Sequence, residues 1–195
     1  MIMRNLLVAT AFLILSFSST STHALSVSSR RQWLSQGVSV AATGAALVGN
    51  APHALADTTH KLTNLSNEEF TKILEKDITE KQFLVTGNIS RELYDESCSF
   101  QDEIDTYGMD QWILGTRRLF NGAGSSLRLA SPIQVSSSEA TFKFDEDLMF
   151  NIPLKPVVHL TGTLYLTRDV ATGLITSYKE KWDQGVWEVL KSAKI

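Results

Sequence analysis

The sequence predicts an α+β domain in which N-terminal helices pack on one face of a curved antiparallel sheet. Apolar residues recur at helical spacing as far as residue 120, and the period changes to two from residue 126 onward. No Pro- or Gly-rich linker divides residues 57–195, and a segment of this length can bury one hydrophobic core. Helices first and a strand meander second are typical of this class.

The first helix is predicted to begin after Ser66. Ser66 and Glu69 have the spacing of a capping box. The apolar residues that follow at near-helical spacing are Phe70, Ile73, Leu74 and Ile78. Gly87 is its predicted end.

Two more helices and one strand are expected between residues 90 and 123. The stretch 90–97 predicts a short helix, and 98–103 predicts a short strand in which Phe100 faces the core. After a turn at Gly108, the stretch 109–123 predicts a third helix. Its predicted inward residues are Trp112, Ile113, Leu119 and Phe120.

Four strands are predicted next, at 126–136, 139–152, 156–169 and 174–183. The last two are joined by a hairpin in which Gly173 is available for positive φ. The final stretch, 186–195, is compatible with either a strand or a helical turn. The strands therefore predict an antiparallel meander.

Residues alternate between two faces along the last predicted strand. Ser177, Lys179 and Lys181 would face solvent, whereas Tyr178, Glu180 and Trp182 would face inward beside Thr176. This inward surface, aromatic with one carboxylate, suits a flat or polyene-like apolar ligand with one polar anchor. In the alternative interpretation the aromatics fill the core and Glu180 pairs with a buried Arg117 or Arg118.

The first 56 residues are basic, since they contain three arginines and no Asp or Glu. Residues 1–24 have a positive start, a ten-residue apolar core and a small-residue cleavage pattern ending at Ala24, as in a signal peptide. Residues 25–56 are predicted to hold a short transit segment and a second export signal. The mature domain would then be residues 57–195.

The second signal resembles a twin-arginine translocation signal. It has the pair Arg30 and Arg31, Trp33 in the aromatic position, an Ala/Gly-rich run, and Ala54 and Ala56 as a peptidase pattern. Residues 1–56 as a whole resemble the tripartite presequence of thylakoid-lumen proteins in algae with a complex plastid. This resemblance implies a location in the thylakoid lumen of a plastid. The alternative is a signal peptide followed by an Ala-rich linker or a membrane-anchoring helix.

Composition excludes several kinds of partner and site. The mature part keeps 15 of the 18 Lys and Arg against all 21 acids, so it is mildly acidic and predicts no nucleic-acid partner. Cys98 is the single cysteine and reads as a packing residue. Only His60 and His159 remain in residues 57–195, so a His/Cys metal cluster cannot be assembled. A carboxylate-only site is the alternative, but no EF-hand loop or paired-ligand spacing supports it, and we predict no metal site. No cofactor and no mature transmembrane segment are expected either.

Two runs resemble the nuclear-transport-factor-2-like superfamily, which includes SnoaL-like and ketosteroid isomerase-like proteins. The closest resemblance is to a plant and cyanobacterial subfamily without assigned activity. The first run carries Tyr94, Phe100, Asp102, Gly108 and Trp112; the second carries Gly162, Gly173, Ile175, Glu180, Trp182 and Asp183. The resemblance implies a cone-shaped fold that encloses an apolar pocket. Glu103 departs from the subfamily, which commonly has Pro there.

The predicted pocket residues are Tyr94, Phe100, Trp112, Tyr178, Glu180 and Trp182. Asp102 is the candidate general base, since a carboxylate at an apolar mouth has a raised pKa. Alternatively, Asp102 accepts hydrogen bonds from the following turn. His159 is a candidate partner for Asp102, or a half-exposed strand residue.

Three functions fit these observations. One is a non-catalytic lumenal module that binds a small apolar ligand or a photosynthetic membrane complex, for its assembly or maintenance. Another is an isomerase, dehydratase or cyclase that uses a pocket carboxylate. The last is a structural subunit docked on a photosystem or antenna. A homodimer formed through the sheet is a further expectation.

Overall fold

A computed structural model describes residues 60–195. The targeting residues Arg30, Arg31, Ala54 and Ala56, and the predicted boundaries at residues 24 and 56, lie outside this part. Within residues 60–195, no helix is long and apolar enough to cross a membrane.

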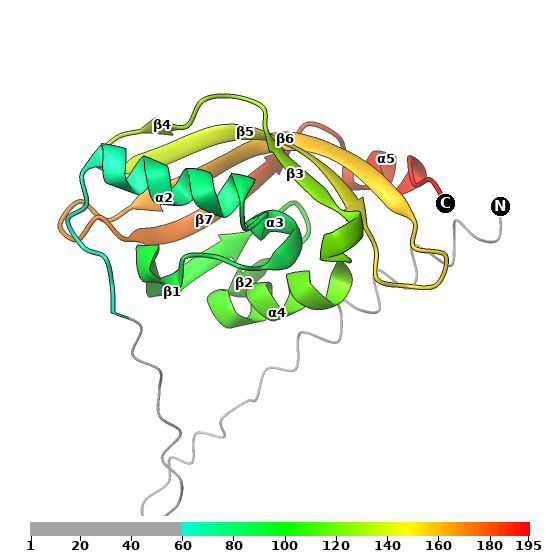
Figure 1. Cartoon of the computed structure of the whole chain (residues 1–195), viewed down its shortest axis with the longest axis horizontal. Helices are drawn as coiled ribbons and strands as arrows, with labels where there is room; N and C mark the ends of the chain where they lie inside the picture. The colour runs from blue at the N-terminus through cyan, green and yellow to red at the C-terminus, as the bar shows by residue number, and fades with distance from the viewer. Residues whose placement is uncertain (1–59) are drawn as a thin grey trace, which may run out of the picture. The chain divides into compact units, whose positions relative to one another are not determined.

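Along residues 60–195, two α-helices come first, followed by two strands, a third α-helix, five strands and a final α-helix (Figure 1). The α-helices are α2 (Asn67–Thr79), α3 (Phe83–Thr86), α4 (Met109–Leu119) and α5 (Val186–Lys191), and short 3₁₀ turns are η2 (Arg91–Leu93) and η3 (Gly122–Gly124). The strands are β1 (Tyr94–Gln101), β2 (Thr106–Gly108), β3 (Ser126–Leu129), β4 (Gln134–Val135), β5 (Glu139–Met149), β6 (Val157–Arg168) and β7 (Ile175–Trp182). The α+β class is confirmed.

The strands form one sheet in the order β2-β1-β7-β6-β5-β3, with β4 also paired to β5. Strands β5, β6 and β7 form the predicted antiparallel meander, and the hairpin places Gly173 at φ 75°. The sheet is mixed, however, because β1 pairs with β7 in parallel. Within the meander, β7 pairs with β6 along one edge only. Its other edge pairs with β1, which comes much earlier in the sequence. Sequence pattern alone does not reveal such a distant pairing.

The first helix is shorter than predicted. Ser66 and Glu69 form the expected capping box, but α2 ends at Thr79 and the chain turns before α3. Gln82 makes this turn at φ 54°, and its side-chain amide bonds to the carbonyl and N–H groups of Leu127 in β3. Gly87 ends α3, at φ 63°, as expected of a left-handed helix terminus. The tertiary bonds of Gln82 thus interrupt the local helical pattern.

Two other local predictions are settled by the structure. The prediction of a helix over residues 90–97 is wrong. Arg91–Leu93 forms a single 3₁₀ turn, and β1 begins at Tyr94. Burial of Tyr94, Cys98 and Phe100 favours the strand, whose sheet partner β7 lies far along the chain. The ambiguous C-terminal stretch forms helix α5.

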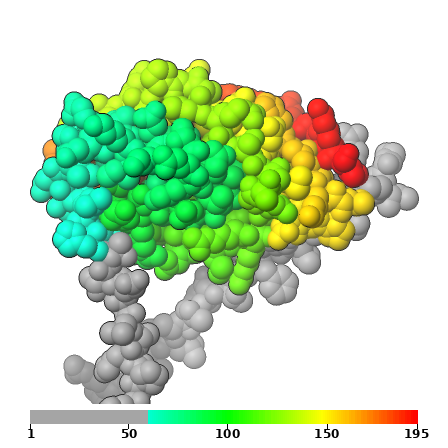
Figure 2. Space-filling model, in the orientation of Figure 1, coloured from blue at the N-terminus to red at the C-terminus, as the bar shows by residue number. Residues whose placement is uncertain are grey.

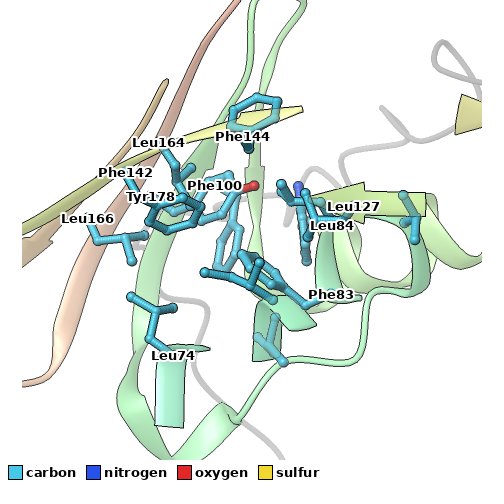
Figure 3. Close-up of a cluster of buried hydrophobic side chains, with 14 of the residues drawn as sticks. Leu74, Phe83, Leu84, Phe100, Leu127, Phe142, Phe144, Leu164, Leu166 and Tyr178 are labelled. Atoms are coloured by element: carbon cyan, nitrogen blue, oxygen red, sulfur yellow. The ribbon is translucent and has the colours of Figure 1, made fainter. Parts of the chain in front are cut away.

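The core centres on stacked aromatic rings around Phe100. The ring of Phe100 lies 4.7 Å from Tyr178, 4.9 Å from Trp112 and 5.5 Å from Tyr94, centroid to centroid. Figure 3 shows Phe83 and Leu84 of α3, with Leu127 of β3, on one side of Phe100 and Tyr178, and Phe142 and Leu166 of the sheet on the other. Offset stacking adds to the free energy that burial alone provides.

Buried polar groups fasten α2 to the rest of the domain. Asp77 is fully buried and accepts hydrogen bonds from the N–H and hydroxyl groups of Ser90. At the other end of α2, the guanidinium of Arg168 lies 4.0 Å from the ring centre of Phe70 and donates to Asn67. Residues of α2 and α3 consequently cover much of the face seen in Figure 2.

Candidate ligand-binding cavity

A cavity of about 140 Å³ lies between the sheet, α4 and α5. Helix α4 contributes Trp112 and Gly115, and α5 contributes Val189. No heavy atom lies within 4 Å of the position that a Cβ at Gly115 would take, so the missing side chain leaves open space on this wall. Ile104 also lines the cavity and is 42% exposed, which places the mouth at the loop between β1 and β2.

Strand pairing brings two glutamates to the cavity face of the sheet. Glu146 of β5 pairs with Leu160 of β6, and Glu180 of β7 pairs with Leu164 of the same strand. Between these two rows lies Gly162, where a Cβ would meet the ring of Phe144 at 2.8 Å. Gly162 therefore lets the sheet and its side chains pack closely beside both glutamates.

Glu180 is held by two neighbours on its own strand. The Tyr178 hydroxyl donates to its Oε1, and the Trp182 indole N–H donates to its Oε2 at 3.0 Å. Burial, together with the charge of Asp102, raises the pKa of Glu180 to about 7 despite these bonds. Glu180 can therefore gain or lose a proton near neutral pH.

Glu146 is 3% exposed and also lines the cavity. Its Oε2 is buried without a hydrogen-bond partner. Burial first, and then the charge of Glu180, raises the pKa of Glu146 well above its ordinary value. Such a group is costly unless it is protonated or finds a partner in the cavity.

Asp102 stands at the mouth, at the end of β1. Its Oδ1 accepts the backbone N–H groups of Ile104 and Asp105, at 2.7 and 2.8 Å, as the turn interpretation expected. Burial nevertheless raises the pKa of Asp102 above its ordinary value. Tyr107 lies beside it on the cavity wall, and its buried hydroxyl has no partner. The mouth thus has both a turn-forming carboxylate and an unpaired phenol.

The six predicted pocket residues divide into two groups. Trp112, Glu180 and Trp182 line the cavity. Tyr94, Phe100 and Tyr178 are completely buried in the aromatic stack and do not line it. Tyr178 still acts on the cavity through its hydrogen bond to Glu180.

His159 does not meet Asp102. It lies in β6 between Val158 and Leu160, which line the cavity, so its own side chain points to the opposite face of the sheet. There its Nδ1 lies 3.1 Å from Asp147, beside the ion pair of Asp147 with Arg128. The structure therefore contains no Asp102–His159 dyad. The alternative in which Glu180 pairs with a buried arginine is not formed either. Glu180 accepts hydrogen bonds from Tyr178 and Trp182, and Arg117 donates to the Gly87 carbonyl.

Sequence reasoning missed Glu146 and Tyr107. Glu146 is an even number of residues from the buried Phe142, Phe144 and Leu148 of β5, so it lies on the same face of the strand. This alternation in the sequence indicates an inward carboxylate. Tyr107 had no such signal, because its position depends on how the loop after Asp102 folds back into β2.

Other reactive groups lie away from the cavity. Cys98 is buried, and burial raises the pKa of its thiol to about 12, in keeping with a packing role. Among residues 60–195, no group of three His, Cys, Asp or Glu side chains is arranged to hold a metal ion.

Comparisons with known proteins identify the fold. A SnoaL-like protein of Jannaschia sp. CCS1, assigned as a polyketide cyclase, superposes with a TM-score of 0.50 at 11% identity, over 67% of this chain and 96% of that one. An epoxide hydrolase of Mycobacterium tuberculosis superposes with a TM-score of 0.47 at 13% identity, over 64% of this chain and 89% of that one. A nuclear-transport-factor-2-like protein of Anabaena variabilis superposes with a TM-score of 0.44 at 14% identity, over 64% of this chain and 96% of that one. No protein-family profile and no curated protein sequence matches the chain.

The domain therefore has the nuclear-transport-factor-2-like fold, as the two sequence runs implied. In this structure the helices and the curved mixed sheet enclose the cavity described above. The arrangement is compatible with binding a small ligand.

Proposed function

We propose that the protein is a non-catalytic module that binds a small apolar ligand in the cavity beside Glu180. The observation that carries this proposal is the cavity itself, whose wall is mainly aliphatic and aromatic with a few inward carboxyl groups. Cavities of this volume take ligands the size of one ring. A single-ring ligand is therefore favoured over the polyene considered from the sequence.

Enzymatic activity of the isomerase, dehydratase or cyclase kind is the second candidate. Burial raises the pKa of both Asp102 and Glu180, and Glu180, whose pKa is raised to about 7, favours this candidate because a group that titrates near neutral pH is suited to proton transfer. Binding ranks first because Asp102 is engaged by its own turn and His159 lies on the other face. In an enzyme, Asp102→Asn would abolish turnover of the natural ligand while binding persisted.

The proposed location is the thylakoid lumen, and the proposed role there is assembly or maintenance of a photosynthetic complex. Docking as a structural subunit on a photosystem or antenna, and a homodimer through the sheet, are the related proposals. The support for the location is the order of the signals in residues 1–56.

The location is tested with the full chain fused to a C-terminal fluorescent reporter in an alga with a complex plastid. The fusion should reach the lumen, and replacing both Arg30 and Arg31 by Lys should leave it in the stroma. If the double variant reaches the same compartment as the parent, the twin-arginine interpretation fails.

Ligand binding is tested by calorimetric titration of the full chain with toluene. The parent should bind, and Gly115→Leu should weaken binding at least tenfold because the new side chain fills the cavity. The matched control is Arg118→Leu, which adds the same side chain on the exposed face of α4. Absence of toluene binding by the parent, or equal binding by Gly115→Leu, contradicts the proposal.

A further inference from the structure

The charges in the cavity point to a more specific ligand class, an inference that rests on the proposed function. Asp102, Glu146 and Glu180 all line the cavity, and none of the described residues on its wall is Lys, Arg or His. The wall thus offers carboxyl groups to a ligand and no cationic side chain to balance them.

Glu146 contributes a buried carboxyl group to this arrangement. It is 3% exposed, and its buried Oε2 has no hydrogen-bond partner. A buried acceptor without a partner costs free energy that a donor on a ligand would recover. A donor that is positively charged would recover more, because charge-assisted hydrogen bonds are the stronger ones.

Glu180 is arranged as an acceptor on both oxygens. Tyr178 donates to Oε1 and Trp182 donates to Oε2, so both neighbours favour the ionised carboxylate. Burial and the charge of Asp102 oppose that form, and the opposing effects leave the pKa of Glu180 at about 7. A cation in the cavity would favour the ionised state.

The rest of the wall suits carbon groups attached to a cation. Trp112, Trp182, Phe120 and Phe150 provide aromatic surface, and aromatic faces attract cations. Leu148, Val158 and Leu160 provide aliphatic contact. Such walls cannot replace the hydration shell of a metal ion, whereas they match the substituents of an organic ammonium group.

We propose that the cavity binds a small protonated amine whose apolar part is the size of one ring. Its ammonium group lies between Glu146 and Glu180, and its carbon skeleton lies against the aromatic wall. The amine donates to the carboxyl groups of Glu146 and Glu180, and Glu180 keeps its bonds from Tyr178 and Trp182.

Binding of such a cation is linked to proton release. The titratable groups that line the cavity from the strands and the mouth loop are Asp102, Glu146, Tyr107 and Glu180. Tyr178 lies behind the wall, with its hydroxyl on Glu180. A bound ammonium lowers the pKa of the glutamates, so a protonated carboxyl loses its proton to the buffer when the ligand enters. A neutral ligand has no such effect.

The experiment compares benzylamine with benzyl alcohol, two probes of the same size, by calorimetry on the full chain. At pH 8 benzylamine should bind at least tenfold more tightly than benzyl alcohol. At pH 6 its binding should release protons, seen as a heat that depends on the ionisation enthalpy of the buffer. Glu146→Gln and Glu180→Gln should each remove most of the preference for the amine and keep binding of benzyl alcohol. The matched control is Glu139→Gln, at an exposed position of β5.

The outcomes separate this inference from the proposed function. If benzyl alcohol binds and the amine has no advantage, the cavity is a site for neutral ligands and the amine inference fails. If the amine binds equally well to Gly115→Leu, it binds outside the cavity, and the inference fails too. If neither probe nor toluene binds, the proposed function itself is contradicted.

Discussion

The hydroxyl of Tyr178 donates to the carboxyl of Glu180, two residues further along the same strand. Tyr178 is completely buried in the aromatic core, whereas Glu180 lines the cavity. This bond therefore connects the packing of the domain with the chemistry of the candidate site. Any change that moves the stack around Phe100 should also change the orientation of Glu180.

The raised pKa of Glu180 makes stability depend on pH. Below about pH 4.5 the group is protonated in both folded and unfolded chains, and between about 4.5 and 7 only the unfolded chain ionises. Stability is therefore fully present at the acidic end of this window and is lost as the pH rises through it, by about 3 kcal/mol for this group. Burial of Glu146 acts in the same direction.

Glu180→Gln should accordingly flatten this part of the pH profile. Urea unfolding at pH 5 and pH 8 measures the difference, and the loss of stability between the two should be smaller in the variant than in the parent. Glu139→Gln serves as the control, because its side chain is exposed on the same sheet. An unchanged pH profile in Glu180→Gln would show that this carboxyl titrates normally.

Phe100→Ala should destabilise the domain by about 3–5 kcal/mol. The side chain is fully buried and touches three aromatic rings, so its removal leaves a cavity in the stack. Chemical denaturation measures the change. Tyr165→Ala, which removes a ring that is 39% exposed on β6, should cost under about 1 kcal/mol. Equal costs for the two variants would be incompatible with Phe100 as the centre of the core.

Two glycines should respond to alanine in opposite ways. At Gly162 a Cβ would lie 2.5 Å from the Lys181 carbonyl oxygen, so Gly162→Ala should lower the free energy of unfolding by about 1–3 kcal/mol. At Gly115 a Cβ meets nothing within 4 Å, so Gly115→Ala should raise the free energy of unfolding by about 0.5–1 kcal/mol because alanine favours the helix. Thermal unfolding of both variants tests the packing of β6 against β7; a stabilising Gly162→Ala would refute it.

The fold could be predicted from the sequence where local pattern determines it. The Ser66 capping box, the period-two strands and the hairpin at Gly173 depend on neighbours a few residues apart, and all three are formed. The parallel pairing of β1 with β7 and the break at Gln82 depend on residues 45 or more positions away. Periodicity does not contain that information.

The candidate site was predictable in part for the same reason. The inward direction of Tyr178, Glu180 and Trp182 follows from alternation along one strand. Which of them lines the cavity depends on where α4 and α5 pack, so Tyr178 lies behind the wall and Trp182 on it. His159 illustrates the limit: its chemistry suits a partner for Asp102, whereas its parity in β6 places it on the outer face as the half-exposed strand residue of the alternative interpretation.

Ligand binding in the cavity is tested most directly by an NMR titration of the ¹⁵N-labelled full chain with toluene, followed through the tryptophan indole N–H signals. The Trp182 indole donates to Glu180 on the cavity wall, whereas Trp187 is 56% exposed on α5 and does not line the cavity. A ligand-binding cavity predicts a saturable shift of the Trp182 signal, with Trp187 unmoved. A Trp182 signal that stays in place while toluene is added, or one that moves only together with Trp187, would show that toluene does not bind in the cavity.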